Sequence, residues 1–120
     1  MWHQGETDAG HLTSKEQYYN NLSHLLSLTR ERFAVPRLPF ICGGFVKQWQ
    51  DTMMNECALI LAAMRCLAEK DENAAFIETD DLESNDEAMG NGDIIHFSTN
   101  ALDILGKRYY DAFAKIVSLA

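Results

Sequence analysis

Basic residues are scarce in this chain, which has 10 Lys and Arg against 18 Asp and Glu and a formal net charge of −8. Binding to nucleic-acid phosphates needs clustered Lys and Arg, whereas the basic residues of the first half are dispersed, as in Arg30, Arg32, Arg37 and Lys47. The composition therefore argues against a nucleic-acid partner. No uninterrupted apolar stretch approaches the roughly 20 residues that span a bilayer, so no membrane partner is predicted either.

Cysteines are also few, and their number is odd: Cys42, Cys57 and Cys66. Cys57 and Cys66 fall on one predicted helix, where nine residues separate them by about 13 Å, beyond the reach of a disulfide. We expect all three to be buried free thiols.

The length and the apolar content indicate one folded domain. At 120 residues the chain is near the lower end of the usual domain size. Hydrophobic residues make up 47% of it and are mixed with charged ones, which is typical of a globular rather than a disordered chain.

The first half of the chain shows a loop, a helix and a strand in succession. Residues 1–12 are expected to form a loop. A helix should follow from Ser14 to Phe33, because Ser14 to Gln17 have capping-box spacing, and an apolar stripe recurs at helical intervals in Tyr18, Leu22, Leu25, Leu26 and Phe33. Pro36 and Pro39 prevent its continuation. The short apolar run Leu38 to Phe45 predicts a buried strand.

The second half repeats this alternation. A helix is predicted from Gln50 to Lys70, and its buried side should carry Met53, Cys57, Ile60, Leu61, Met64 and Leu67. A strand should follow at Ala74–Thr79, then an acidic, polar loop over 80–92. The last helix is predicted over Thr99–Ser118, with a core-facing side of Ile104, Leu105, Tyr109, Ala112, Phe113, Ile116 and Val117. The order of elements predicts an α/β layer structure with parallel strands.

Two motifs could carry chemistry, and the second along the chain is Asp93-Ile94-Ile95-His96. Three residues apart in a turn, a carboxylate can fix one imidazole nitrogen while the other nitrogen faces a nucleophile. Gly90 and Gly92 permit a tight path into that turn. The spacing alone also fits an ordinary turn with a helix-capping histidine.

The first motif, Trp2-His3-Gln4-Gly5-Glu6-Thr7-Asp8, is longer and more specific. It resembles a block of the SGNH-hydrolase superfamily, as found in carbohydrate esterase family six and in sialate O-acetylesterase-like domains. The resemblance extends through Leu38-Pro39-Phe40 to Asp93-Ile94-Ile95-His96-Phe97 and to the final helix with Leu105-Gly106-Lys107-Arg108-Tyr109.

The resemblance implies a role for each motif residue. His96 would be the general base and Asp93 its orienting acid. Gln4 would donate its side-chain amide to the oxyanion, with Gly5 allowing close backbone approach. Two roles stay open for Glu6: it holds the loop through hydrogen bonds, or it is an alternative acid partner of His96. The motif's other polar residues, His3 and Asp8, are expected to support the turn.

The nucleophile is not recognisable. In the resembled family it lies in a Gly-x-Ser-Asn block that precedes the first motif. None of the serines has that context: Ser14, Ser23, Ser27, Ser84, Ser98 and Ser118. Ser84-Asn85 lacks the preceding glycine, and Ser14 is expected to be a helix cap. We therefore expect the chain to be inactive by itself.

The resemblance implies a partial three-layer SGNH-hydrolase fold, flavodoxin-like, with parallel strands, helices on both faces and the amino-terminal strands missing. Residues 1–120 would be the carboxyl-terminal portion of a single SGNH-type esterase domain, with the last two strands and a remnant of a third. The uncovered sheet edge should favour self-association or pairing with the missing segment.

The implied reaction is hydrolysis of O-acetyl esters on carbohydrate, of sialate or xylan type, by a Ser-His-Asp mechanism. No cofactor is required and no metal site is predicted. Two alternatives stay open: a non-catalytic pseudoenzyme or interaction module, and one half of a split esterase whose serine is on another polypeptide.

Overall fold

The computed structural model describes residues 1–119 as an α/β structure. Its elements in chain order are α1 (Glu6–Gly10), α2 (Lys15–Arg32), β1 (Phe40–Gly43), α3 (Lys47–Gln50), α4 (Met54–Lys70), β2 (Ala74–Ile77), α5 (Asn85–Met89) and α6 (Thr99–Ser118). No helix in this described part is long and apolar enough to cross a bilayer.

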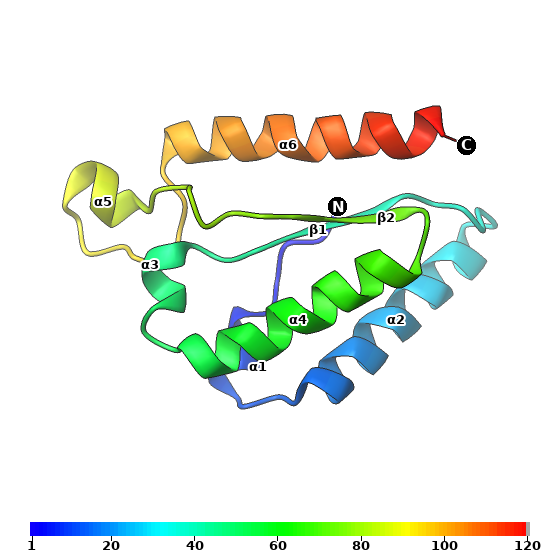
Figure 1. Cartoon of the computed structure of the whole chain (residues 1–120), viewed down its shortest axis with the longest axis horizontal. Helices are drawn as coiled ribbons and strands as arrows, with labels where there is room; N and C mark the ends of the chain where they lie inside the picture. Colours follow the sequence, from blue (N-terminus) through cyan, green and yellow to red (C-terminus); the bar gives the residue numbers. More distant parts are fainter. Residues whose placement is uncertain (120) are drawn as a thin grey trace.

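The two strands are parallel and lie between two layers of helices. β1 pairs with β2 in a register that aligns Phe40 with Ala74 and Gly43 with Ile77. Figure 1 shows α6 along one face of this sheet, and α2 and α4 along the other. The α/β class, the parallel strands and the helices on both faces are therefore confirmed.

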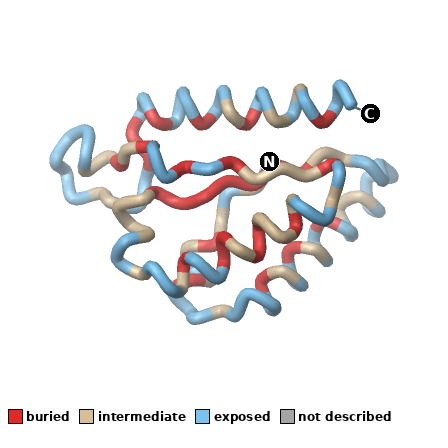
Figure 2. Tube along the Cα trace, viewed as in Figure 1, coloured by how far each residue is buried: buried red, intermediate tan, exposed pale blue. Residues whose placement is uncertain are grey.

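Each face of the sheet has its own core. Alternate side chains of a strand point to opposite faces, so Cys42 packs with α2 and α4 while Ile41 packs with α6. Figure 2 shows that β1 is buried along its length, whereas the helices are buried mainly on the sides that face the sheet or each other. Such two-sided burial is why the strand reads as a continuous apolar run.

The amino-terminal segment extends the sheet on the other edge of β1. Phe40 N and Gly44 N donate toward β2, at 2.8 Å to Asn73 O and 3.0 Å to Ile77 O, whereas Ile41 O accepts from Trp2 N at 2.7 Å. Trp2 forms an isolated parallel bridge with Cys42. Residues at the start of the chain therefore run beside β1, and their carboxyl-terminal direction leads to the same end of the sheet as β1 and β2.

The long helices confirm most of the sequence predictions. Ser14 accepts a hydrogen bond from Gln17 N and begins α2. However, too many apolar residues were predicted to be buried, because the side of a helix that packs against its neighbours does not include every apolar residue of the helix. Tyr18, Leu22 and Leu26 are buried, but Leu25 and Phe33 are exposed. In α6, Leu105, Tyr109 and Ile116 are buried, whereas three others are exposed: Ile104, Phe113 and Val117.

The predicted loops were partly wrong. The loop over 1–12 contains α1, and the loop over 80–92 contains α5, whose Ser84 and Glu87 form a reciprocal capping box. The helix predicted from Gln50 to Lys70 begins later, at Met54, because the chain turns at residues 51–53 after the short α3, which ends at Gln50. Both strands are shorter than predicted. The cysteines are free as expected, but Cys66 is only half-buried.

Candidate active site

Asp93 and His96 form a hydrogen-bonded pair beyond the carboxyl end of the sheet. His96 Nδ1 lies 2.9 Å from Asp93 Oδ1 and 3.1 Å from Oδ2, and His96 N donates to Oδ1 at 3.2 Å. One carboxylate thus orients both the ring and its backbone. With Nδ1 held as the donor, Nε2 carries the lone pair that a general base needs. The His96 side chain is 74% exposed, so a reactant can reach it.

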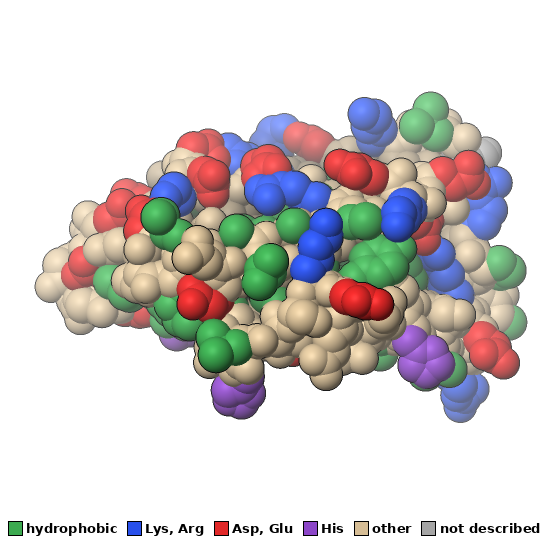
Figure 3. Space-filling model, turned by 60° about the horizontal axis from the view of Figure 1, so that its bottom comes forward, with side chains coloured by type: hydrophobic (Ala, Val, Ile, Leu, Met, Phe, Trp, Pro, Cys, Tyr) green, Lys and Arg blue, Asp and Glu red, His purple; other side chains and the backbone are tan. Residues whose placement is uncertain are grey.

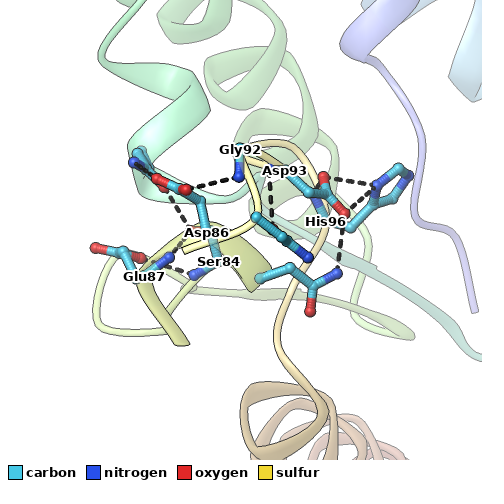
Figure 4. A network of polar contacts seen from close by, with 9 residues as sticks. Ser84, Asp86, Glu87, Gly92, Asp93 and His96 are labelled. Atoms are coloured by element: carbon cyan, nitrogen blue, oxygen red, sulfur yellow. Dashed lines mark hydrogen bonds and ion pairs between the residues drawn. The ribbon is translucent and has the colours of Figure 1, made fainter. Parts of the chain in front are cut away.

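The turn that carries this pair is built on α5. Asn85 N donates to His96 O and Asp86 N donates to Asp93 O, both at 2.9 Å. Asp86 also accepts from Gly92 N at 2.8 Å. Figure 4 shows the Asp93 carboxylate facing the His96 ring on one side of the turn, with Ser84, Asp86 and Glu87 on the other. The capping box fixes α5, and α5 fixes the turn.

The charge of Asp93 is stabilised by two neighbours. The Asn85 amide donates to Asp93 Oδ2 at 2.9 Å, and this hydrogen bond, followed by those from His96, lowers the pKa of the Asp93 carboxyl against the opposing effect of partial desolvation. A carboxylate that stays ionised stabilises the imidazolium that forms when His96 accepts a proton.

Sequence reasoning missed this supporting set: Gln48, Ser84, Asn85, Asp86 and Glu87. Gln48 from α3 donates to Asp86 Oδ2 at 2.8 Å, and its Oε1 accepts from the Ser84 hydroxyl. The signal that could have revealed it is Ser84-x-x-Glu87, which has capping-box spacing.

The first motif divides its side chains between the two faces of the sheet. Gln4 Nε2 donates to Asp8 Oδ2 at 2.8 Å, and Tyr18 Oη donates to Gln4 O at 2.9 Å, so Gln4 is held on the α2 side. Asp8 uses one of the two amide hydrogens of Gln4. Asp8 Oδ1 also accepts from Thr13 Oγ1 at 3.3 Å.

Gly5 packs into the core at the start of α1. It is buried with φ of +142°, a conformation that favours glycine. A Cβ there would lie 2.8 Å from Ile60 Cγ2 and 2.9 Å from Phe45 Cζ. The close approach that Gly5 makes in the structure is therefore to core side chains. Glu6 begins α1, and its carboxylate makes no hydrogen bond to a described residue; the acid that bonds His96 is Asp93.

His3 lies on the α6 side and links the two motifs. Its ring meets the Phe97 ring edge to face with centroids 5.6 Å apart, and its Nδ1 lies 3.1 Å from Tyr109 Oη. Because Phe97 follows His96 directly, this contact brings the first motif against the turn that carries Asp93 and His96. His3, His11 and Asp8 do not form a metal cluster, and within residues 1–119 no group of three His, Cys, Asp or Glu side chains is placed to hold a metal.

The two motifs touch through the His3 and Phe97 rings, and the Asp93–His96 pair lies beyond the carboxyl end of a parallel sheet, where ligands of such folds lie. A protein-family model described as carbohydrate esterase, sialic acid-specific acetylesterase matches residues 1–115. The chain belongs to this family. Membership in the acetylesterase family confirms the resemblance deduced from the two motifs. Comparisons with curated proteins and with solved structures gave no match.

Proposed function

We propose that this chain supplies the base and acid of a serine esterase that removes acetyl groups from carbohydrate hydroxyls, of sialate or xylan type. The observation that carries the proposal is the Asp93–His96 pair, with Nδ1 bonded to the carboxylate and Nε2 directed away from it. The family supports an acetylated carbohydrate as the substrate.

We further propose that the nucleophilic serine belongs to a segment outside these 120 residues. Three of the chain's own serines, Ser14, Ser84 and Ser98, are engaged elsewhere, and Ser23 Oγ on α2 is buried without a hydrogen bond to a described residue. Ser84 Oγ donates to Gln48 and accepts from Glu87 N, and Ser98 Oγ donates to Glu83 and accepts from Ala101 N. Ser14 caps α2, and within the described residues no serine bonds the His96 ring.

The surface beside the first motif supports this placement. A hollow of about 260 Å³ lies there, with an almost wholly apolar lining of Met1, His3, Phe97, Leu102, Leu105, Gly106 and Tyr109. Phe113 and Val117 are exposed and lie at helical spacing from Tyr109 on the same side of α6. The free edge beyond Trp2 pairs with no described residue. An apolar strand paired with this edge would cover the hollow and bring its carboxyl end toward His96.

In the proposed mechanism, His96 Nε2 takes the proton of the serine hydroxyl as its oxygen attacks the acetyl carbonyl. Asp93 stabilises the imidazolium, and the second amide hydrogen of Gln4 donates to the oxyanion; such a donor contributes about 3–4 kcal/mol. The intermediate collapses, and His96 returns the proton to the departing sugar oxygen. Water, deprotonated by His96, then attacks the acetyl-enzyme and releases acetate and the free serine.

The surface charge does not form the basic patch that a nucleic-acid partner would need. Basic side chains stand next to acidic ones on the face shown in Figure 3. Among the ion pairs of the described residues, Arg65 pairs with Glu78 at 2.8 Å. Such neutralised cations are unlike the continuous basic surface that binds nucleic-acid phosphates, so we propose no nucleic-acid partner.

The test compares the purified chain with the chain co-expressed with a segment that carries a Gly-x-Ser-Asn block. Hydrolysis of O-acetylated N-acetylneuraminic acid is measured for each, with His96→Ala and a Ser→Ala segment as controls. We expect activity only in the complemented protein, and its loss in both variants. Activity of the chain alone that disappears in His96→Ala would place the nucleophile within the 120 residues.

Two other outcomes favour the alternatives. If a soluble complemented complex forms and stays inactive, the chain is a pseudoenzyme or an interaction module. If the serine block lies on a separate polypeptide encoded beside this one, the protein is a split esterase. Self-association through the free edge is expected without the segment, and a cooperatively unfolding monomer in ultracentrifugation and thermal melts would contradict it.

A further inference from the structure

Tyr109 reaches from α6 across the sheet to the first motif. Its ring is buried, and its hydroxyl lies 3.2 Å from Trp2 O and 3.1 Å from His3 Nδ1. Tyr109 therefore joins the carboxyl-terminal helix to the segment that carries Gln4 and Gly5. The neighbouring Tyr110 is largely exposed and makes no such contact.

Gly43 leaves the space through which this hydroxyl passes. A Cβ at residue 43 would overlap Tyr109 Oη and would lie 3.3 Å from His3 Nδ1. A glycine at the end of β1 is thus required by the tyrosine–histidine contact.

The number of hydrogens decides the direction of the two hydrogen bonds. A phenol has one hydrogen, and the Trp2 carbonyl can only accept. If Tyr109 donates to Trp2 O, then its oxygen must accept from His3 Nδ1–H. The opposite arrangement, with Tyr109 donating to His3, leaves two acceptor oxygens, Tyr109 Oη and Trp2 O, 3.2 Å apart with no hydrogen between them, and their repulsion disfavours it.

We propose that His3 and Tyr109 form a directed chain, His3 Nδ1–H to Tyr109 Oη–H to Trp2 O, which makes His3 a positioning residue. These hydrogen bonds fix His3 as the Nδ1–H tautomer. They also hold its ring against that of Phe97, the residue that follows His96. His3 is exposed, and its Nε2 is then an acceptor without a hydrogen bond to any described residue.

Desolvation lowers the pKa of His3, against a smaller raising effect from the charge of Glu6. The ring is therefore neutral at neutral pH, as a single-donor tautomer requires. The positioning role deepens the proposed esterase function and rests on it, whereas the tautomer is a property of the chain by itself.

The test is long-range ¹H–¹⁵N NMR of the imidazole rings in the purified chain. We expect His3 to be mainly Nδ1–H in the parent protein and in Tyr110→Phe, and to change to mainly Nε2–H in Tyr109→Phe. His96, held by Asp93, should stay Nδ1–H in all three and serves as the internal control. His3 as Nε2–H in the parent protein, or unchanged in Tyr109→Phe, would overturn the proposal.

A second variant covers the case in which Tyr109→Phe does not fold. His3→Asn keeps an N–H donor near the Nδ1 position, whereas His3→Leu does not. We expect the Tyr109 ring resonances to stay close to those of the parent in His3→Asn and to move in His3→Leu. Equal Tyr109 resonances in the two variants would overturn the proposed hydrogen-bond chain. Neither measurement uses hydrolysis, so failure here is distinguishable from failure of the esterase proposal.

Discussion

Asp93 holds His96 at two points, through the ring Nδ1 at 2.9 Å and the backbone N at 3.2 Å. The Asp93–His96 pair is thus oriented by a local turn, independently of any distant segment.

Replacing Asp93 by Asn should remove the charge that stabilises the His96 imidazolium while keeping the shape of the turn. In the complemented esterase we expect kcat to fall on the order of 10³–10⁴-fold, with KM changed little. Steady-state hydrolysis of the acetylated sugar measures this. Asp103→Asn, an exposed aspartate of α6, is the matched control and should keep the parental kcat. A kcat loss below tenfold in Asp93→Asn would mean that another acid, such as Glu6, serves His96.

Replacing Asn85 by Ala should raise the pKa of the Asp93 carboxyl, because the Asn85 hydrogen bond is the main cause of its lowered value. A carboxyl whose pKa is lowered on folding stabilises the fold above its unfolded pKa, and this contribution is lost as the pH falls through the folded pKa. As the pH falls, the Asn85→Ala variant should therefore lose the stability that ionised Asp93 contributes at a higher pH than the parent protein does. Carboxyl ¹³C NMR titration measures the shift, with exposed Asn100→Ala as control; unchanged titration of Asp93 would refute the role of Asn85.

Replacing Gly43 by Ala should destabilise the fold by about 1–3 kcal/mol, because the new methyl overlaps Tyr109 Oη. Gly106→Ala is the matched control: it lies inside α6, and its Cβ would meet nothing within 4 Å. The control should stabilise the protein by up to about 1 kcal/mol. Urea unfolding of both variants measures the difference, and equal stability would show that Tyr109 can move without cost.

The three thiols should differ in reactivity. Burial raises the pKa of Cys42 to about 12 and that of Cys57 to about 11, whereas Cys66 is only half-buried. Because the thiolate is the reactive form, an aromatic disulfide reagent at pH 8 should label one thiol of the native chain quickly and the other two only after unfolding. Cys66→Ser should abolish the fast phase; a fast phase that persists would locate the accessible thiol elsewhere.

The sequence by itself determined the alternation of elements, the long helices and the two motifs. The spacing of apolar residues and the Ser14 cap predict α2, because a helix buried on one side has apolar residues at helical intervals. The apolar run from Leu38 predicts β1, because a strand buried on both faces is continuously apolar. The Asp93-x-x-His96 pair could also be predicted, since both residues lie in one turn and their hydrogen bonds need no distant element.

Tertiary structure decided the rest. Nothing in the local sequence shows that Phe97 contacts His3, or that Tyr109 reaches Trp2 past Gly43, because these contacts join residues about a hundred positions apart. Packing also selected which apolar residues of α6 are buried: Leu105 faces the sheet, while Phe113 stays exposed. A helix presents only one side to a two-stranded sheet. The spacing of apolar residues predicts which side that is, and the neighbouring layer determines which of its residues are buried.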